Sequence, residues 1–409
     1  MDFIRSLENA KFVPKLMEKY SDINGELPLV EELDGKGLYI PSNTHSGQRK
    51  LLLTEMQYYN RIYSHDTKQV IIYAGSAPGD HTPSILKMYP NFIFIMIDPH
   101  YHLMEYPYQY IYKKEHPLLT DSGYTGDKLK YLSKPLKAVK CNGKTYNALT
   151  TKSFGSIESF NTKYFNECRV FVIQDYVSSF LASQLKNKLK GYKYYYISDI
   201  RSDNNDANIL FDNALQLIVQ NKLECLAYYK FVLPKYNNVV SFASWMQPVF
   251  DEAKELGFDF IGEYESKKYK YLDGDIYLQP WARKFSGETR LLTYGKNVKV
   301  YDAEEWRRKF NFYNFYRAIC YNDIKFILNP WRRNIYDGCA DCILEMQILD
   351  NYIKRFGGRF TDLKKMIDKT NPLKRHMYCV RDIHTKVTFI IPIDGKLLTY
   401  TYKDGECNQ

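Results

Sequence analysis

A glycine-rich loop between two apolar runs has the spacing of a nucleoside-binding site. Gly75 and Gly79 follow the first run, and Asp98 ends the second, roughly 20 residues later. Glycines let a ligand approach the backbone closely, and an acid at the end of a strand can hold the hydroxyls of a ribose. Ala77 replaces the middle glycine of a dinucleotide fingerprint, and no Gly-Lys-Ser/Thr follows, so NAD and Walker-type nucleotide binding fit poorly. S-adenosyl-L-methionine, which has no pyrophosphate, fits best, with an ordinary tight turn as the alternative.

Three charged residues further along the chain stand in or after apolar runs: Asp199, Lys230 and Glu288. In an open α/β sheet the carboxyl ends of the strands converge on one crevice, so these side chains can meet there. Lys230 stands between Tyr229 and Phe231. Desolvation at such a position lowers the pKa of a lysine, which can then act as the base that a ribose 2′-hydroxyl needs to attack a methyl group. The alternative is that each of the three is an ion-pair member without a catalytic role.

The cysteines indicate neither a disulfide framework nor a metal centre. The chain has 8 cysteines in 409 residues at irregular spacing, which is typical of reduced, partly buried thiols. The close pair Cys339 and Cys342 has no second pair at zinc-ribbon spacing. We therefore expect no metal site.

Charge and aromatic content are compatible with a nucleic-acid partner. The net charge is +10, and many of the 38 tyrosines stand beside lysines, as in residues 192–196. Cations neutralise phosphates and rings stack on bases, although biased genome composition and ordinary β-sheet tyrosines would give the same pattern. The sequence has no apolar run of membrane-spanning length and no signal-peptide core at its start, so we expect no membrane association and a cytosolic or nuclear setting.

The elements that must position these residues follow from apolar periodicity. Apolar runs predict strands at 69–74, 92–97, 170–173, 194–198, 223–233, 276–278 and 290–294. Helical spacing predicts helices at 49–63, 82–89, 176–190, 207–221, 245–255, 304–324 and 342–356. A hairpin is predicted for 387–393 and 397–402, around Asp394-Gly395. Continuous apolar strands that alternate with helices indicate an open, mostly parallel α/β sheet of the Rossmann-like type.

Pattern changes along the chain predict three segments. Residues 1–46 are expected to form an N-terminal arm, and residues 47–295 the sheet domain. Within the sheet domain, residues 106–167 lose the apolar pattern and are predicted to be an insertion. Residues 296–409 are predicted to be an α+β extension at the C-terminus.

Several motifs together resemble one known family. They are Gly47-Gln48-x-Lys50-Leu51-Leu52-Leu53-x-Glu55, Tyr73-x-Gly75-Ser76-Ala77-Pro78-Gly79-x-His81, Ile97-Asp98, Ile197-Ser198-Asp199-x-Arg201-Ser202, Lys230, Leu278-Gln279-Pro280 and Ser286-x-Glu288-x-Arg290-Leu291-Leu292. In this order they resemble the poxvirus cap-specific mRNA 2′-O-methyltransferases, which also serve as the small, stimulatory subunit of the viral poly(A) polymerase. The resemblance extends from Gly47 to Arg290 and is interrupted by the insertion.

The resemblance implies a catalytic tetrad and a set of cofactor contacts. The tetrad Lys-Asp-Lys-Glu falls on Lys50, Asp199, Lys230 and Glu288, with Lys230 as the base, the two acids orienting it, and Lys50 placing the hydroxyl. The implied contacts to S-adenosyl-L-methionine are Gln48, Tyr73, Gly75, Ala77, Pro78, Gly79, His81, Asp98, His100 and Val172. His100 stands where the family has an arginine beside the adenosine.

The resemblance also implies a site for the 7-methylguanine of an mRNA cap, in which aromatic rings sandwich the cationic base and acids bind its edge. This sequence departs from the family there, because Asn237 replaces one expected acid and Arg307 stands at the register of the other. The candidates that remain are Tyr236, Phe285, Ser286 and Glu305.

We therefore expect a methyltransferase that acts on the ribose 2′-hydroxyl of the first transcribed nucleotide of capped mRNA. The alternative is a non-catalytic, RNA-binding regulatory subunit of a poly(A) polymerase, and both roles can coexist in one protein. The resemblance implies capped mRNA and a poly(A) polymerase catalytic subunit as partners, with the host cytoplasm and the virion as locations. The sequence leaves the oligomeric state open.

Overall fold

The computed structural model describes residues 17–23, 25–26, 47–79, 81–100, 102, 109–113, 139–141, 144–146, 157, 160–166, 168–236, 240–283, 286–318, 340–370, 387–393, 396–403 and 406–408. They belong to two compact units. The first unit draws on Met1–Gln57, Ile276–Thr289 and Glu304–Gln409, and the second on Tyr58–Asp275 and Arg290–Ala303. The domain boundaries predicted from the sequence stay a prediction.

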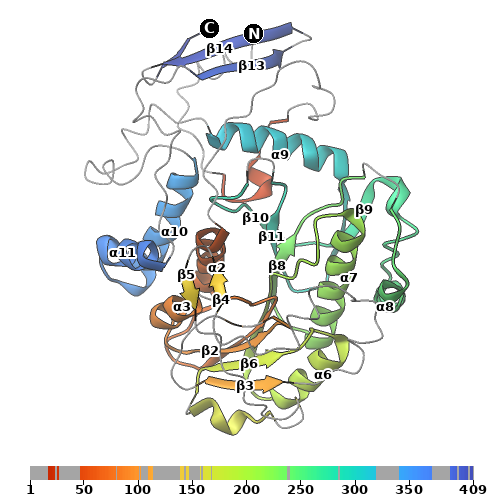
Figure 1. Cartoon of the computed structure of the whole chain (residues 1–409), viewed down its shortest axis with the longest axis vertical. Helices are drawn as coiled ribbons and strands as arrows, with labels where there is room; N and C mark the ends of the chain where they lie inside the picture. The colour runs from red at the N-terminus through yellow and green to blue at the C-terminus, as the bar shows by residue number, and fades with distance from the viewer. Residues whose placement is uncertain are drawn as a thin grey trace. The chain divides into compact units, whose positions relative to one another are not determined.

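The second unit is built on a mostly parallel sheet (Figure 1). Its strands run in the order β11-β8-β7-β1-β2-β6-β3. Their bounds are β1 Gln69–Ala74, β2 Phe92–Ile97, β3 Gln109–Lys113, β6 Val170–Gln174, β7 Lys193–Ser198, β8 Ala227–Phe231 and β11 Thr289–Thr293. The neighbouring pairs from β8 to β3 are all parallel. Every residue of β1, β2, β6 and β8 is buried, as expected for a parallel sheet covered on both faces. The predicted α/β class is confirmed at this level.

Helices cover both faces of this sheet. Helix α3 (Thr82–Met88) connects β1 to β2, whereas α6 (Ser179–Lys188) and α7 (Asp206–Leu223) connect β6 to β7 and β7 to β8. The chain moves across the sheet in opposite directions in these two cases, so right-handed crossovers place α3 on one face and α6 and α7 on the other (Figure 1). The strand order therefore reverses between β1 and β7, and the crevice beyond the carboxyl ends of such strands is where open α/β sheets bind ligands.

Most of the predicted elements are present with shifted ends. The strand predicted at 223–233 is too long, because residue 223 still ends α7 and β8 starts at Ala227. Glu224 takes a left-handed conformation that stops the helix. Strand β3 lies inside the segment predicted as an insertion and pairs with β6 in the main sheet. Its polar, tyrosine-rich sequence gave no apolar run to detect.

A second, two-stranded sheet in this unit was not predicted. Strand β9 (Lys268–Leu272) pairs antiparallel with β12 (Val298–Asp302). Helix α8 (Gln247–Glu255) packs against α7, beside α6. Lysines and tyrosines alternate in β9, so that Tyr269 and Tyr271 are buried while the lysines face outward. Its side chains alternate between more and less buried positions, as in other strands, but it has few of the aliphatic residues that mark a strand in sequence.

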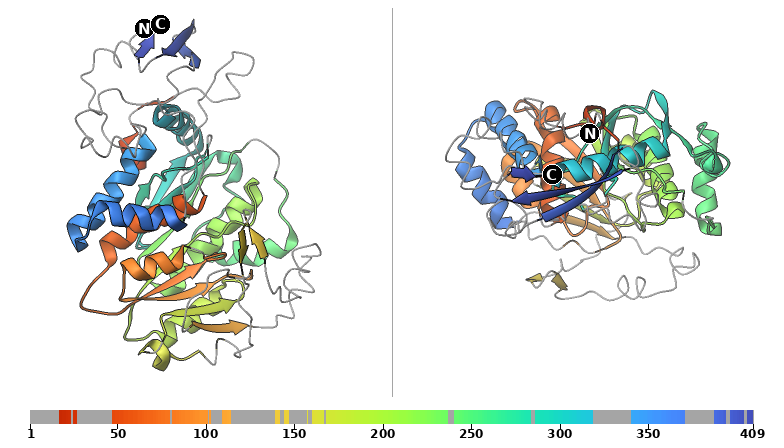
Figure 2. Two further views of the ribbon diagram at one scale, coloured as in Figure 1. Left: turned by 60° about the vertical axis from the view of Figure 1, so that its left-hand side comes forward. Right: turned by 90° about the horizontal axis from the view of Figure 1, so that it is seen from above.

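The first unit is largely helical. It contains most of α2 (Gly47–Ile62) and β10 (Asp275–Tyr277), together with α9 (Ala303–Ala318), α10 (Ala340–Phe356) and α11 (Phe360–Thr370). Helices α10 and α11 lie side by side in both views of Figure 2. Strands β13 (Val387–Ile393) and β14 (Lys396–Lys403) pair antiparallel, which confirms the predicted hairpin, and β15 (Glu406–Asn408) extends it. Helix α11 was missed from the sequence.

The remaining described elements are short. They are the strand pair β4 (Val139–Cys141) and β5 (Lys144–Tyr146) and the 3-10 turns η1 (Tyr20–Asp22), η4 (Thr162–Asn166), η5 (Ser244–Met246) and η6 (Tyr264–Ser266). Among the described residues, the structure contains no helix with the length and apolar character that a membrane crossing requires.

Candidate cofactor and catalytic site

The loop after β1 is pressed against the end of β7. Gly75 has φ +71°, and a Cβ there would lie 2.7 Å from the backbone carbon of Asp199. The Asp199 backbone N–H donates to the Ala74 carbonyl at 2.9 Å, which joins the two strand ends. Gly79 has φ +69°, and a Cβ there would lie 2.9 Å from the Met96 side chain. Gly75 is therefore required by conformation and by space, and Gly79 by its conformation.

Asp98 organises the cofactor loop from the end of β2. Its Oδ2 accepts the Ala77 backbone N–H at 3.1 Å, and its Oδ1 accepts the His100 backbone N–H at 2.8 Å. The His100 ring nitrogen Nδ1 lies 3.0 Å from the same Oδ1. A carboxylate has about four acceptor positions, so at most one stays open for a ribose hydroxyl while His100 keeps this geometry. The His100 side chain is 57% exposed, so it can swing away when a ligand binds.

A buried histidine supports the same loop and was not predicted from the sequence. The His102 ring nitrogen Nε2 lies 2.8 Å from the Ser76 hydroxyl oxygen. Burial lowers the pKa of His102 to about 4, with Asp98 opposing the shift and His100 adding to it. The ring is therefore neutral at pH 7. A lone histidine in a polar stretch carries no periodicity signal that could have identified it.

The other predicted cofactor residues are divided between the units. In the second unit Tyr73 is the buried penultimate residue of β1, His81 precedes α3 and is buried, and Val172 is buried in the middle of β6. Ala77 and Pro78 form the loop between the two glycines. Gln48 belongs to the first unit, on α2.

Asp199 and Lys230 form an ion pair at the carboxyl ends of β7 and β8. The Lys230 ammonium lies 2.9 Å from Asp199 Oδ1, and both side chains are largely buried. Arg290, on β11, donates to the same Oδ1 at 2.6 Å and to the Ser198 carbonyl at 3.2 Å. A single carboxylate thus compensates two cations. The prediction that Lys230 is desolvated is confirmed, and Arg290 is an additional member of the cluster. Its position in the apolar strand Thr289–Thr293 is the same signal that identified Lys230.

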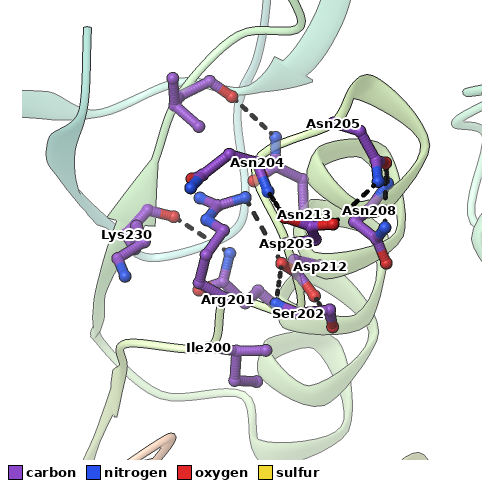
Figure 3. Close-up of polar contacts among 12 residues, drawn as sticks. Ile200, Arg201, Ser202, Asp203, Asn204, Asn205, Asn208, Asp212, Asn213 and Lys230 are labelled. Carbon is purple, nitrogen blue, oxygen red and sulfur yellow. Dashed lines mark hydrogen bonds and ion pairs between the residues drawn. The ribbon is translucent and has the colours of Figure 1, made fainter. Parts of the chain in front are cut away.

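The loop that carries Asp199 is fixed from α7. Asp212 is fully buried there and accepts the Ser202 backbone N–H at 2.9 Å and the Ser202 hydroxyl at 2.8 Å. Figure 3 shows Arg201 extending toward Asp212 beside Lys230, and the Arg201 to Asp212 contact is 3.4 Å. Burial raises the pKa of Asp212, whereas Arg201 and Ser202 oppose the shift. These bonds hold Arg201 and Ser202, which follow Asp199 closely in the chain, and so limit the movement of Asp199.

The other two members of the predicted tetrad pair in the first unit. The Lys50 ammonium lies 2.5 Å from Glu288 Oε1, and the buried Gln279 amide donates to the same oxygen at 3.1 Å. The Glu288 backbone N–H donates to the Ser286 hydroxyl at 3.2 Å. Asn314, on α9, donates to the Ser286 carbonyl at 3.0 Å and fixes this turn. Gln279 was part of a motif but was not expected to touch the tetrad.

The residues predicted to hold the cap are divided between the two units. Tyr236 lies in the second unit and stacks on Tyr264, with ring centroids 4.7 Å apart and planes 27° apart. Ser286 and Glu305 lie in the first unit, where Glu305 forms an ion pair with Lys309 at 2.7 Å along the surface of α9. Phe285, like Cys339 of the predicted Cys-x-x-Cys pair, lies outside the described residues. Tyr264 is the aromatic partner that the sequence did not identify.

A pocket adjoins the stacked tyrosines. Its lining residues are Tyr236, Asp259, Phe260, Glu263, Tyr264, Lys268, Tyr269 and Lys270. Asp206, at the start of α7, holds both rings, because it accepts the Tyr236 backbone N–H and the Tyr264 hydroxyl, each at 2.7 Å. Burial and the nearby Asp206 raise the pKa of Tyr236. The pocket combines aromatic faces, on which a planar base can stack, with two carboxylates and two lysines.

Comparison with known proteins gives no match. No family model matches the chain, and no curated protein matches it. The family resemblance therefore stays a prediction, and function has to be argued from the geometry of the site.

Proposed function

We propose that the protein transfers a methyl group from S-adenosyl-L-methionine to a ribose 2′-hydroxyl of capped RNA. The observation that carries the proposal is the direct contact between the two candidate sites. The glycine-rich loop after β1 and the Asp199 to Lys230 pair meet where the strand order reverses, and the Asp199 N–H donates to the Ala74 carbonyl at 2.9 Å. A nucleoside bound by the loop would place its reactive end near a buried lysine.

The loop fits a cofactor with an adenosine and no pyrophosphate. Gly75 and Gly79 shape the turn between β1 and α3, and Asp98 can accept a ribose hydroxyl at the end of the neighbouring strand. When bound, S-adenosyl-L-methionine supplies an electrophilic methyl group on a sulfonium sulfur. Ala77 and Pro78 lie between the two glycines, where their own backbone can also contact the ligand.

Lys230 is the proposed base. It would remove the proton of the ribose 2′-hydroxyl as the oxygen forms its bond to the methyl carbon and the bond from that carbon to sulfur breaks, leaving a neutral thioether; Asp199 would stabilise the ammonium that Lys230 becomes. Arg290 binds the same carboxylate oxygen and shares the charge of Asp199 with Lys230. The proposal also assigns catalytic roles to Lys50 and Glu288, which pair with each other in the first unit.

The stacked tyrosines are the proposed site for the cap. The rings of Tyr236 and Tyr264 are already in contact, so they must separate to admit 7-methylguanine between them. Asp259 and Glu263 can then accept hydrogen bonds from the edge of the base. The role as a regulatory subunit of a poly(A) polymerase stays a prediction, because no contact among the described residues bears on it.

The test is a methyltransferase assay with purified protein, labelled S-adenosyl-L-methionine and RNA with or without a 7-methylguanosine cap. We expect methylation of the capped RNA at the first ribose. Lys230→Met should lose methylation. It should retain its affinity for the cofactor, because Arg290 still compensates the charge of Asp199. Lys186→Met, which changes a lysine paired with Glu224 on the surface, is the matched control and should remain active. A wild-type protein that binds the cofactor and methylates neither RNA would rule out the proposal.

The cap assignment has its own test. Tyr236→Ala should raise the KM for capped RNA and leave the affinity for cofactor unchanged, because stacking contributes about 1–3 kcal/mol per base. Tyr264→Phe removes only the bond to Asp206 and should change the KM less. Equal activity of Tyr236→Ala on capped RNA would place the cap elsewhere.

A further inference from the structure

Helix α10 belongs to the C-terminal segment, for which neither the sequence nor the proposed function gave a role. Its residue Glu345 is fully buried and binds two different segments of the first unit. Its carboxylate forms a bidentate ion pair with Arg49, in which Nε donates to Oε2 at 2.8 Å and Nη2 donates to Oε1. The same Oε2 accepts the indole N–H of Trp281 at 2.8 Å. One side chain therefore ties α2 to the segment after β10.

These two segments carry the Lys50 to Glu288 pair. Arg49 is the neighbour of Lys50 on α2, and Trp281 follows two residues after Gln279, which donates to Glu288. Successive residues of a helix point about 100° apart, so anchoring Arg49 to α10 sets the rotation of α2 and with it the direction of Lys50. Anchoring Trp281 likewise fixes the chain that leads to Gln279. Trp281 has φ +60°, a strained conformation that surrounding contacts must maintain.

The charges of this cluster are balanced only while Glu345 is present. Arg49 is fully buried, and its second partner, Asp368 on α11, contacts Nη1 at 2.8 Å but is 39% exposed and also binds Lys364. Burial alone lowers the pKa of Arg49, but Glu345 and Asp368 more than offset this, so the pKa lies above its ordinary value. A buried guanidinium without its main carboxylate is strongly unfavourable, and α2 would have to shift to bring it to water.

We propose that Glu345 is a positioning residue for the proposed reaction: it holds Lys50 and Glu288 in register through Arg49 and Trp281. This inference rests on the proposed function for its catalytic consequence, although the positioning itself is independent of it. A residue that is far along the sequence from the reacting groups would thus set their geometry, and a misplacement of about 1 Å can lower a rate about 100-fold.

The first experiment measures the position of Lys50 without any need for activity. The purified full chain is treated with a lysine-acetylating reagent, and the labelling rate of Lys50 is followed by mass spectrometry. The ion pair and the 12% exposure of Lys50 should make labelling slow in the wild type. We expect Glu345→Gln to raise this rate about tenfold or more through local opening, while labelling of exposed Lys254 is unchanged. An unchanged Lys50 rate in folded Glu345→Gln would overturn the proposal.

A matched carboxylate-to-amide change controls for lost charge. Asp362→Asn on α11 removes an exposed acid that pairs with Arg359 and should leave the Lys50 rate unchanged. Because Glu345→Gln can impair folding, Trp281→Phe provides a milder variant that removes one hydrogen bond and keeps most of the ring. It should raise the Lys50 rate less than Glu345→Gln and more than Asp362→Asn. Faster labelling of Lys50 in Asp362→Asn than in Trp281→Phe would also overturn the proposal.

The second experiment tests the catalytic consequence. In the methyltransferase assay Glu345→Gln should lower kcat, with the dissociation constant of S-adenosyl-L-methionine within about threefold of wild type, a difference below 1 kcal/mol. If the wild type is inactive, the proposed function fails while the Lys50 labelling result stands. If the wild type is active and Glu345→Gln retains its kcat, the positioning role fails while the proposed function stands.

Discussion

Lys230 and Arg290 bind the same oxygen, Oδ1 of Asp199, at 2.9 and 2.6 Å. Arginine stays charged at all ordinary pH values, so one of the two cations on this carboxylate is permanent. The permanent cation weakens the hold of Asp199 on a proton of Lys230. In the proposed reaction, the base Lys230 therefore shares its counter-ion with Arg290.

Arg290→Met should shift the acidic limb of the rate profile to higher pH, because Asp199 would then stabilise only the Lys230 ammonium. The kcat at neutral pH should fall about tenfold or more, within the range that a general base contributes. Arg290→Lys keeps the cation and should leave the limb close to its wild-type position. Methylation rates measured from pH 6 to pH 10 at saturating cofactor test this prediction. If folded Arg290→Met kept the acidic limb of its rate profile at the wild-type pH, the prediction would be contradicted.

Gly75→Ala should abolish cofactor binding and destabilise the fold. The new methyl group would lie 2.7 Å from the backbone of Asp199 and Ile200, and φ +71° adds about 1–2 kcal/mol of strain for a non-glycine residue. Gly191→Ala is the matched control, because it has φ +89° and no atom within 4 Å of the new methyl group. Calorimetric titration and urea unfolding measure both effects. Equal destabilisation in the two variants would mean that the close approach of β1 and β7 does not constrain Gly75.

Asp98→Asn should weaken cofactor binding about 10- to 100-fold. It removes a charged acceptor for a ribose hydroxyl, and hydrogen bonds to charged groups contribute about 1.5–3 kcal/mol. His100→Ala removes the ring contact to Oδ1 of Asp98, keeps the backbone N–H bond to it, and should leave affinity unchanged or increase it. Titration with S-adenosyl-L-methionine compares the two. Weaker binding in His100→Ala than in Asp98→Asn would show that the ring itself holds the ligand.

His102 should make the protein less stable as the pH falls from 6.5 toward 4. Burial lowers the pKa of this histidine from 6.5 to about 4, so between these values the unfolded chain binds a proton that the folded chain does not. Protonation therefore favours the unfolded state, and at pH 5 the loss relative to pH 7 is about 2 kcal/mol. In His102→Gln the free energy of unfolding should fall less over this range. Urea unfolding at pH 5 and pH 7 measures the difference, and parallel losses in both proteins would argue against the prediction.

The sequence predicted the elements that carry the site because their apolar periodicity is strong. The runs that became β1 and β2 are wholly buried, and the glycines and Asp98 follow them directly in the chain. Local sequence suffices there because the strand, the turn and the acid are neighbours along the chain. Strand β9 was missed because most of its buried side chains are tyrosines, whereas α11 was overlooked although Phe360, Leu363 and Ile367 stand at helical spacing and are buried.

The residue types of the candidate site were evident from the sequence, but their pairing was not. Lys230 stood out as a charge in an apolar strand, whereas Arg290 was not singled out, and only the strand order β11-β8-β7 places both on Asp199. Pairs such as Arg49 with Glu345, which are 296 residues apart, leave no local pattern at all. Tyr264 likewise became a partner of Tyr236 only through the bonds of both to Asp206. Composition and periodicity determined which side chains are buried, whereas tertiary contacts decided which charges compensate one another, because a buried charge is stable only beside a partner that the fold brings to it.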